Sequence, residues 1–323
     1  MSPPIVKLFL SVDIIGSTEY KAKNTERNND KNGEQSWLAF FETFYQDYPE
    51  KLNTALTKIG VSTLPQPWKS LGDEIIFQVE VNSHKDIADY LFAFMNASDS
   101  AEKYYASKEL PIKVKMAAWL AGFPKINAIV NIKNQISEEP DSRFEDYLGP
   151  SMDTGFRLKQ HATHTRMPIS VEIAYVLSSE TSFSKPELAK ESYFELFFSG
   201  EKELKGVLKG IPYPLFYIRR NSEKESLLQK LTKTEKVDLV DVRKYCEHFI
   251  SEVNDPLVLC KPYFMNDKDP DWQKMPAEHT RENSSSKSSE MNLHLDENEN
   301  SKGDPDLTSE PIQNLIPSPE TLE

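Results

Sequence analysis

Length, composition and charge restrict the class of protein. The chain has 323 residues, of which 38% are hydrophobic and 28% are charged; these proportions are typical of a globular protein and exclude a wholly disordered one. No run approaches 18 apolar residues, so no transmembrane helix is expected, and the net charge of −13 opposes general binding to nucleic acid or anionic membranes. The two cysteines, Cys246 and Cys260, cannot build a disulfide framework, and we expect a reducing, cytoplasmic setting.

The first third of the chain predicts alternating strands and helices. Residues 5–12 are an apolar run that predicts a buried strand ended by Asp13, and the polar, Asn-rich stretch 20–33 predicts a mobile loop. Apolar spacing then predicts three further elements: a helix at 36–58 that Pro49 is expected to kink or break, a β-hairpin with a tight turn at Gly72-Asp73, and an amphipathic helix at 84–107.

The remaining chain adds further strands and helices. The patterns predict a strand at 112–121, a helix at 151–161 entered through Gly149-Pro150, strands at 193–199 and 212–219, and charged helical sequence at 222–254. This order predicts an α+β fold, with helices packed on a mostly antiparallel sheet, over residues 1–220. We expect a helical extension at 221–265 and a disordered acidic tail at 266–323.

Two carboxylates occupy positions at which a metal-binding or catalytic site could form. Asp13 ends the first strand and Asp73 lies in the hairpin turn, and if the strands are neighbours the two side chains converge at one edge of the sheet. Two carboxylates with the Ile14 carbonyl are oxygen ligands suited to divalent cations. Gly16, Ser17 and Thr18 follow and offer N–H groups to phosphate at a helix start. The plainer alternative is that Asp13 caps a helix and Asp73 only shapes a turn.

A third segment makes this set specific. DIIGST at Asp13 and KSLGD at Asp73 are followed by DYLGPSMDTGFR, which places Gly149, Asp153 and Arg157 three, seven and eleven positions after Asp146. LKGVLKG follows at Lys205. In this order the segments resemble the motifs of class III nucleotidyl cyclases across residues 5–219. The resemblance implies that family's sandwich of helices on a mostly antiparallel sheet.

The resemblance also implies a mechanism and an assembly. Asp13, Ile14 and Asp73 would hold two Mg²⁺ or Mn²⁺ ions, and two chains would pair head to tail so that each composite site takes residues from both. Arg157 of the second chain would contact the α-phosphate, and Lys205, or less favourably Lys209, the terminal phosphates. Without the resemblance, Arg157 is more simply a surface arginine that pairs with Asp153 one helical turn away.

The sequence departs from the family at one catalytic position. An Asn is expected where Asp153 stands, and an ionised carboxylate accepts but cannot donate a hydrogen bond. The divergence, the single catalytic domain, the long insertion before Asp73 and the C-terminal extension are similar to the pyrimidine cyclases of bacterial Pycsar antiphage systems. This narrower resemblance implies cyclic UMP as a second messenger for a separate effector protein.

The choice of base remains open in the sequence. Lys69 and Asp146 match the family's base-binding pair, and one donor beside one acceptor suits uracil, cytosine or adenine. Uridine is the first choice on the resemblance, with cytidylate cyclase, adenylate cyclase and a non-catalytic nucleotide-binding module as alternatives. A pyrimidine is small, so its pocket could be narrowed by aromatic side chains of the helix at 36–58: Phe41, Phe44, Tyr45 and Tyr48. Packing in the core explains these aromatic residues better. His161 and His164 lack further zinc ligands nearby, so an ordinary helix C-terminus explains them better.

Overall fold

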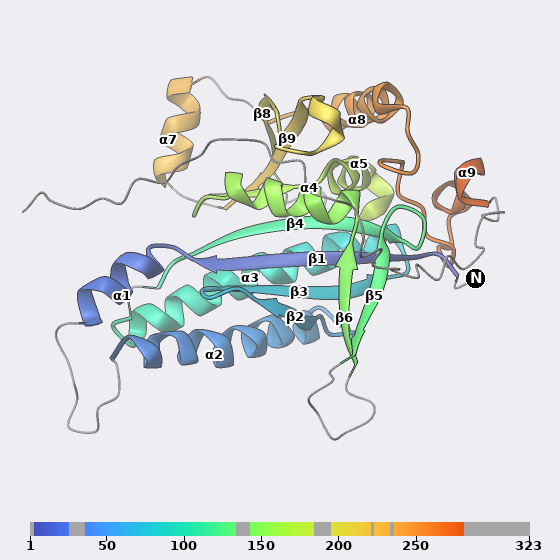
Figure 1. Ribbon diagram of the computed structural model, residues 1–323. Helices are drawn as coiled ribbons and strands as arrows, with labels where there is room; N and C mark the ends of the chain where they lie inside the picture. The colour runs from blue at the N-terminus through green and yellow to red at the C-terminus, as the bar shows by residue number, and fades with distance from the viewer. Residues whose placement is uncertain are drawn as a thin grey trace, which may run out of the picture. The chain divides into compact units, whose positions relative to one another are not determined.

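A seven-stranded sheet organises the chain. The computed structural model describes residues 3–25, 36–110, 112–133, 143–183, 195–220, 223–232 and 236–280 (Figure 1). In spatial order the sheet contains β2 (Gln66–Ser70), β3 (Glu74–Val81), β1 (Ile5–Ile14), β4 (Val114–Phe123), β7 (Arg166–Ile169), β9 (Tyr213–Arg219) and β8 (Leu196–Lys202). The pairing of β4 with β7 is parallel and every other pairing in this sheet is antiparallel. The predicted α+β class is therefore confirmed.

One face of the sheet is covered by two long helices. α2 (Ser36–Lys58) and α3 (His84–Ser107) pack together against the side chains of β1 and β3 that point to this face, among them Leu10 and Phe77. Ser83 begins α3 with a capping box in which its side chain and that of Asp86 each accept a backbone N–H. α2 continues through Pro49 as one helix, so the expected break at this residue does not occur.

The opposite face carries α4 (Pro150–Leu158) and the hairpin of β5 (Ala128–Lys133) and β6 (Arg143–Leu148). A cluster of aromatic side chains fills the space beneath them: Phe9, Trp68, Trp119 and Tyr147. α4 can lie close to β4 because residue 155 is glycine; a Cβ there would lie 2.3 Å from Trp119. At its start, Ser151 donates its N–H to the Asn127 side chain at 3.1 Å. These contacts fix α4 against the sheet.

The C-terminal part of the described chain packs back on the domain. α8 (Leu239–Val253) contacts α5 (Val171–Leu177), and α7 (Glu223–Thr232) and α9 (Ala277–Thr280) complete the helices of this region. The expected disordered tail is wrong for residues 266–280: 270–273 form a helical turn and Trp272 is buried between apolar and aromatic neighbours. The rest of that predicted tail lies outside the described residues.

Several other expectations need correction. The polar stretch predicted as a loop starts as α1 (Ser17–Thr25), with residues 26–33 outside the described part. The helical pattern at 222–254 divides into α7 and α8. The strands β5, β6 and β7 and helix α5 were not predicted. Among the described residues no helix is long and apolar enough to cross a membrane.

Candidate active site

The structure brings Asp13 and Asp73 together, although they are 60 positions apart in the chain. Ile14, the last residue of β1, donates its N–H to the carbonyl of Asp73 at 3.0 Å. The β1–β3 register places Asp13 opposite Glu74. The backbones that carry the two carboxylates are therefore joined at one end of the sheet. We call Asp13, Asp73 and Glu74 the carboxylate cluster.

Asp13 has an environment that opposes its ionisation. Burial raises its pKa, and the negative charges of Asp73 and Glu74 raise it further. Lys115, which lies opposite Asp13 on β4, donates to it at 3.0 Å and lowers the pKa in part. The side chain of Asp13 keeps 24% of its surface exposed. It is therefore a partly exposed carboxylate in a negative environment, which an additional cation would stabilise.

The start of α1 closes the other side of Asp73. The buried Ser17 donates its hydroxyl to the Asp73 carboxylate, while Gly16 and Thr18 are exposed. This contact orients Asp73 and leaves the backbone N–H groups of the first turn of α1 beside it. The expected helix start at these residues is observed, since α1 begins at Ser17 and Ser17 contacts Asp73.

The donor set fits a hard divalent cation. Two carboxylates and a strand-end carbonyl are oxygen donors, which Mg²⁺ and Mn²⁺ prefer, and a nucleotide triphosphate would supply the remaining oxygens. Within the described ranges no group of three or more His, Cys, Asp or Glu side chains has metal-holding geometry. A cation at Asp13 and Asp73 would therefore depend on a ligand for part of its shell.

The hairpin that the sequence did not predict delivers Asp146. The Lys69 ammonium on β2 lies 2.7 Å from the Asp146 carboxylate on β6, and 4.4 Å above the Trp68 ring. The two side chains retain 26% and 19% exposure, so both remain accessible to a ligand. The predicted base-binding pair is thus brought into contact.

Helix α4 presents Asp153 and Arg157 on an exposed surface. Arg157 Nε donates to the carbonyl of Lys205 at 3.1 Å, so the two predicted phosphate-binding segments meet. Asp153 and Lys209 line a cavity of about 190 Å³, which Val253 at the end of α8 also lines. The loop that carries Lys205 and Lys209 therefore belongs to the surface around α4.

The aromatic residues of α2 divide between two environments. Phe41, Phe44 and Tyr48 are buried in the core, which confirms the plainer interpretation for these three. Tyr45 is half-buried, donates its hydroxyl to the Gly72 carbonyl at 2.7 Å and lines a cavity of about 290 Å³ with Lys69. Among the four, Tyr45 is the one that shares a cavity with the predicted base-binding lysine.

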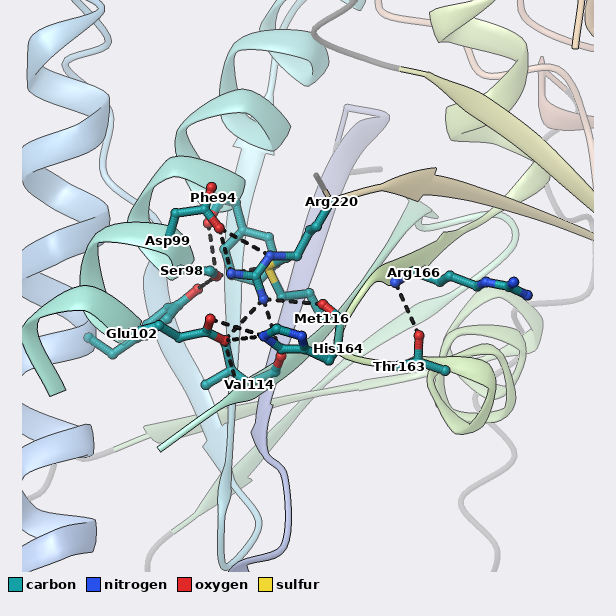
Figure 2. A network of polar contacts seen from close by, with 11 residues as sticks. Phe94, Ser98, Asp99, Glu102, Val114, Met116, Thr163, His164, Arg166 and Arg220 are labelled. Atoms are coloured by element: carbon teal, nitrogen blue, oxygen red, sulfur yellow. Dashed lines mark hydrogen bonds and ion pairs between the residues drawn. The ribbon is translucent and has the colours of Figure 1, made fainter. Parts of the chain in front are cut away.

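An ion cluster around the buried Arg220 supports this end of the sheet (Figure 2). Arg220, directly after β9, donates to Asp99 and Glu102 of α3 and to the carbonyls of Val114 and His164. We call Arg220, Asp99, Glu102 and His164 the Arg220 cluster. It holds the first residue of β4, next to Lys115, which contacts Asp13. The sequence analysis missed this cluster because its members are far apart in the chain.

The two histidines after α4 lie in different surroundings. His164 Nε2 lies 3.0 Å from a Glu102 carboxylate oxygen, inside the Arg220 cluster. His161 ends the helical turn η1 (Lys159–His161), and burial together with the positive charge of Lys202 lowers its pKa. The expected helix C-terminus therefore fits His161, whereas His164 lies three residues beyond it and pairs with Glu102.

Comparison with known proteins gives similarity of structure alone. The sequence matches no protein-family model and no curated protein. The adenylyl cyclase CyaB from P. aeruginosa is similar to this chain with 12% identity and a TM-score of 0.47, over 68% of this chain and 97% of that one. The guanylate cyclase domain of RhGC from Catenaria anguillulae, solved in complex with GTP, is similar with 10% identity and a TM-score of 0.45. The match covers 68% of this chain and 100% of that one. Similarity at this level does not assign a function.

Proposed function

We propose that this chain is a nucleotidyl cyclase that converts UTP into 3′,5′-cyclic UMP and pyrophosphate. The observation that carries the proposal is the joining of Asp13 to Asp73 at one sheet end, beside the start of α1. These residues belong to segments that resemble cyclase metal-binding motifs. The pair expected to bind the base, Lys69 and Asp146, is also in contact.

The residues of the carboxylate cluster would hold one or two Mg²⁺ or Mn²⁺ ions through Asp13, Asp73 and the Ile14 carbonyl. When bound, such cations lower the pKa of the ribose 3′-hydroxyl and neutralise charge on the triphosphate. The oxygen of that hydroxyl bonds to the α-phosphorus, the bond to pyrophosphate breaks, and the hydroxyl proton leaves. Asp153 can accept a hydrogen bond from the ribose, or the proton itself.

The cations of α4 and its neighbouring loop supply positive charge for the phosphates. Arg157 presents a planar, permanently charged fork that suits the negative charge developing on the α-phosphate. Lys205, with Lys209 as the second choice, would meet the terminal phosphates. We propose that these residues serve the carboxylate cluster of a second copy, so that a homodimer has two composite sites.

The base and the biological role rest on the narrower resemblance to Pycsar cyclases. Lys69 and Asp146 offer one donor and one acceptor, which suits uracil, cytosine and adenine. We propose uridine first, and cyclic UMP as a messenger for a separate antiphage effector protein. Asp153 in place of Asn is the feature that favours a module which binds nucleotide without turnover.

The test is product analysis by mass spectrometry. The purified chain is incubated with Mn²⁺ and each of the four ribonucleoside triphosphates, with and without lysate from phage-infected cells. We expect cyclic UMP as the dominant product and no activity for Asp73→Ala. Glu80→Ala should have normal activity, since Glu80 is an exposed acid on β3, the strand that follows Asp73. Cyclic CMP or cyclic AMP as the dominant product would overturn the base assignment. Absence of product under every condition would overturn the proposal that the chain is an enzyme.

A further inference from the structure

Glu74, the third member of the carboxylate cluster, is the most buried of the three. Its side chain is 6% exposed, whereas that of Asp13 is 24% exposed. One carboxylate oxygen accepts the Ser11 hydroxyl at 2.6 Å, and the other contacts the Lys159 ammonium at 2.5 Å. A buried carboxylate is stable only when such partners surround it, so Lys159 supplies the positive charge that Glu74 requires.

Lys159 comes from a different part of the proposed machinery. It follows α4 directly, two positions after Arg157, and its ammonium lies 4.8 Å from the centre of the Phe156 ring of the same helix. Glu74 is the neighbour of Asp73 in the chain. The ion pair therefore joins the end of the helix that carries Arg157 to the strand that begins directly after Asp73.

We propose that Lys159 is a positioning residue that couples the two halves of the machinery carried by one chain, the α4 surface and the carboxylate cluster. This inference rests on the proposed function. In a homodimer these halves belong to different composite sites. A shift of Glu74 when a cation binds beside it would then move the end of α4, and with it Arg157 at the other site.

The contacts distinguish this role from simple packing. α4 is already held by Gly155 against Trp119 and by Ser151 on Asn127. The helix therefore has a docking surface that does not depend on Lys159. Loss of the ammonium would leave an uncompensated negative charge beside Asp13 and Asp73 and release one end of α4. Cation affinity and turnover should consequently change in opposite directions.

The first measurement is Mn²⁺ binding to the nucleotide-free protein, followed by electron paramagnetic resonance. Lys159→Met should bind Mn²⁺ several-fold more tightly than wild type, Glu74→Gln several-fold more weakly, and Lys159→Arg like wild type. Lys113→Met is the matched control, because it removes an exposed charge from the residue before β4, whose carbonyl accepts the Ile15 N–H at 2.8 Å. We expect its affinity to stay within twofold of wild type.

The second measurement is the kcat and KM of the same variants. Lys159→Met should lower kcat at least tenfold with a smaller change in KM, and Lys159→Arg should restore it. Unchanged Mn²⁺ affinity in both Lys159→Met and Glu74→Gln would overturn the coupling, as would a parallel loss of affinity and kcat. If Lys159→Met does not fold, the Mn²⁺ affinity of Glu74→Gln alone tests the coupling. Absence of Mn²⁺ binding in wild type would instead contradict the proposed function.

Discussion

Two ionic clusters lie at the same end of the sheet and differ in how completely their charges are satisfied. Arg220 is 7% exposed and donates to two carboxylates and two carbonyls. Asp13, in the carboxylate cluster, is more exposed and lies near two other negative charges. Removing the partner of a buried charge destabilises a fold, whereas an incompletely compensated group has capacity left for a ligand.

Breaking the satisfied cluster should have the largest effect. Arg220→Met leaves the more buried Glu102 and two carbonyls without this donor, so the free energy of unfolding should fall by about 3 kcal/mol. This is the lower end of the range for a buried pair, because Asp99 is 53% exposed. Chemical denaturation measures this loss. Lys23→Met is the control, since Lys23 is 71% exposed and pairs with the equally exposed Glu19 one helical turn away; it should change stability by less than about 1 kcal/mol. Equal effects of the two substitutions would contradict the structural role of the Arg220 cluster.

The α4 surface should respond in function and not in stability. Arg157→Lys keeps the charge but loses the planar fork, so kcat should fall by about 10²-fold while the melting temperature is unchanged. Steady-state kinetics and thermal unfolding on the same preparation separate these effects. An unaltered kcat would show that Arg157 is the surface arginine of the plainer interpretation.

A third buried charge extends the comparison to a group with one oxygen unsatisfied. Glu172 on α5 is 9% exposed, and within the described residues one of its carboxylate oxygens has no hydrogen-bond partner. Burial raises its pKa from 4.5 to about 6. The folded state therefore binds the Glu172 proton more tightly than the unfolded state does. Protonation of Glu172 stabilises the fold fully below pH 4.5, and this stabilisation is lost as pH rises through 6.

Replacing Glu172 should therefore stabilise the protein at neutral pH. Glu172→Gln should increase the free energy of unfolding at pH 7 by about 2 kcal/mol, the equivalent of the pKa shift, and remove the corresponding slope between pH 4.5 and 6. Denaturation at several pH values measures both quantities. A loss of stability at pH 7 would show that the ionised carboxylate has a partner.

The smallest expected effect is the pH dependence of cation binding. A proton and a cation compete for Asp13, whose pKa is raised by burial. Mn²⁺ affinity should therefore increase as pH rises through this raised pKa, by at most about tenfold per pH unit, and level off above it. Titrations from pH 4 to 8 measure the curve. An affinity independent of pH over this range would contradict competition at Asp13.

The sequence pattern predicted the helices and strands whose apolar residues recur at regular spacing. β1, α2, the β2–β3 hairpin and α3 were found because apolar spacing and Gly72-Asp73 indicate them directly. β6 depends on β5 for its pairing, and α5 is seven residues long and apolar apart from Glu172, so periodicity cannot distinguish it from a strand.

The motifs located Asp13, Asp73, Lys69 and Asp146, whereas the charged residues around the two aspartates were missed. Glu74 and Lys115 matter because they lie opposite or beside Asp13 in the strand register, which the sequence does not state. Lys159 contacts Glu74 across 85 positions. The acid directly after Asp73 was the one available signal, because an ionisable residue at the start of a buried strand needs a partner.

The most direct test of the central claim is complementation between two inactive variants. Asp73→Ala lacks part of the carboxylate cluster and Arg157→Ala lacks the arginine, so each homodimer should be inactive. Mixed dimers would hold one intact composite site, and random exchange of subunits predicts about a quarter of wild-type cyclase activity. Recovery to this level supports a site shared between two copies. An inactive mixture, under conditions where labelled subunits demonstrably exchange, would contradict it.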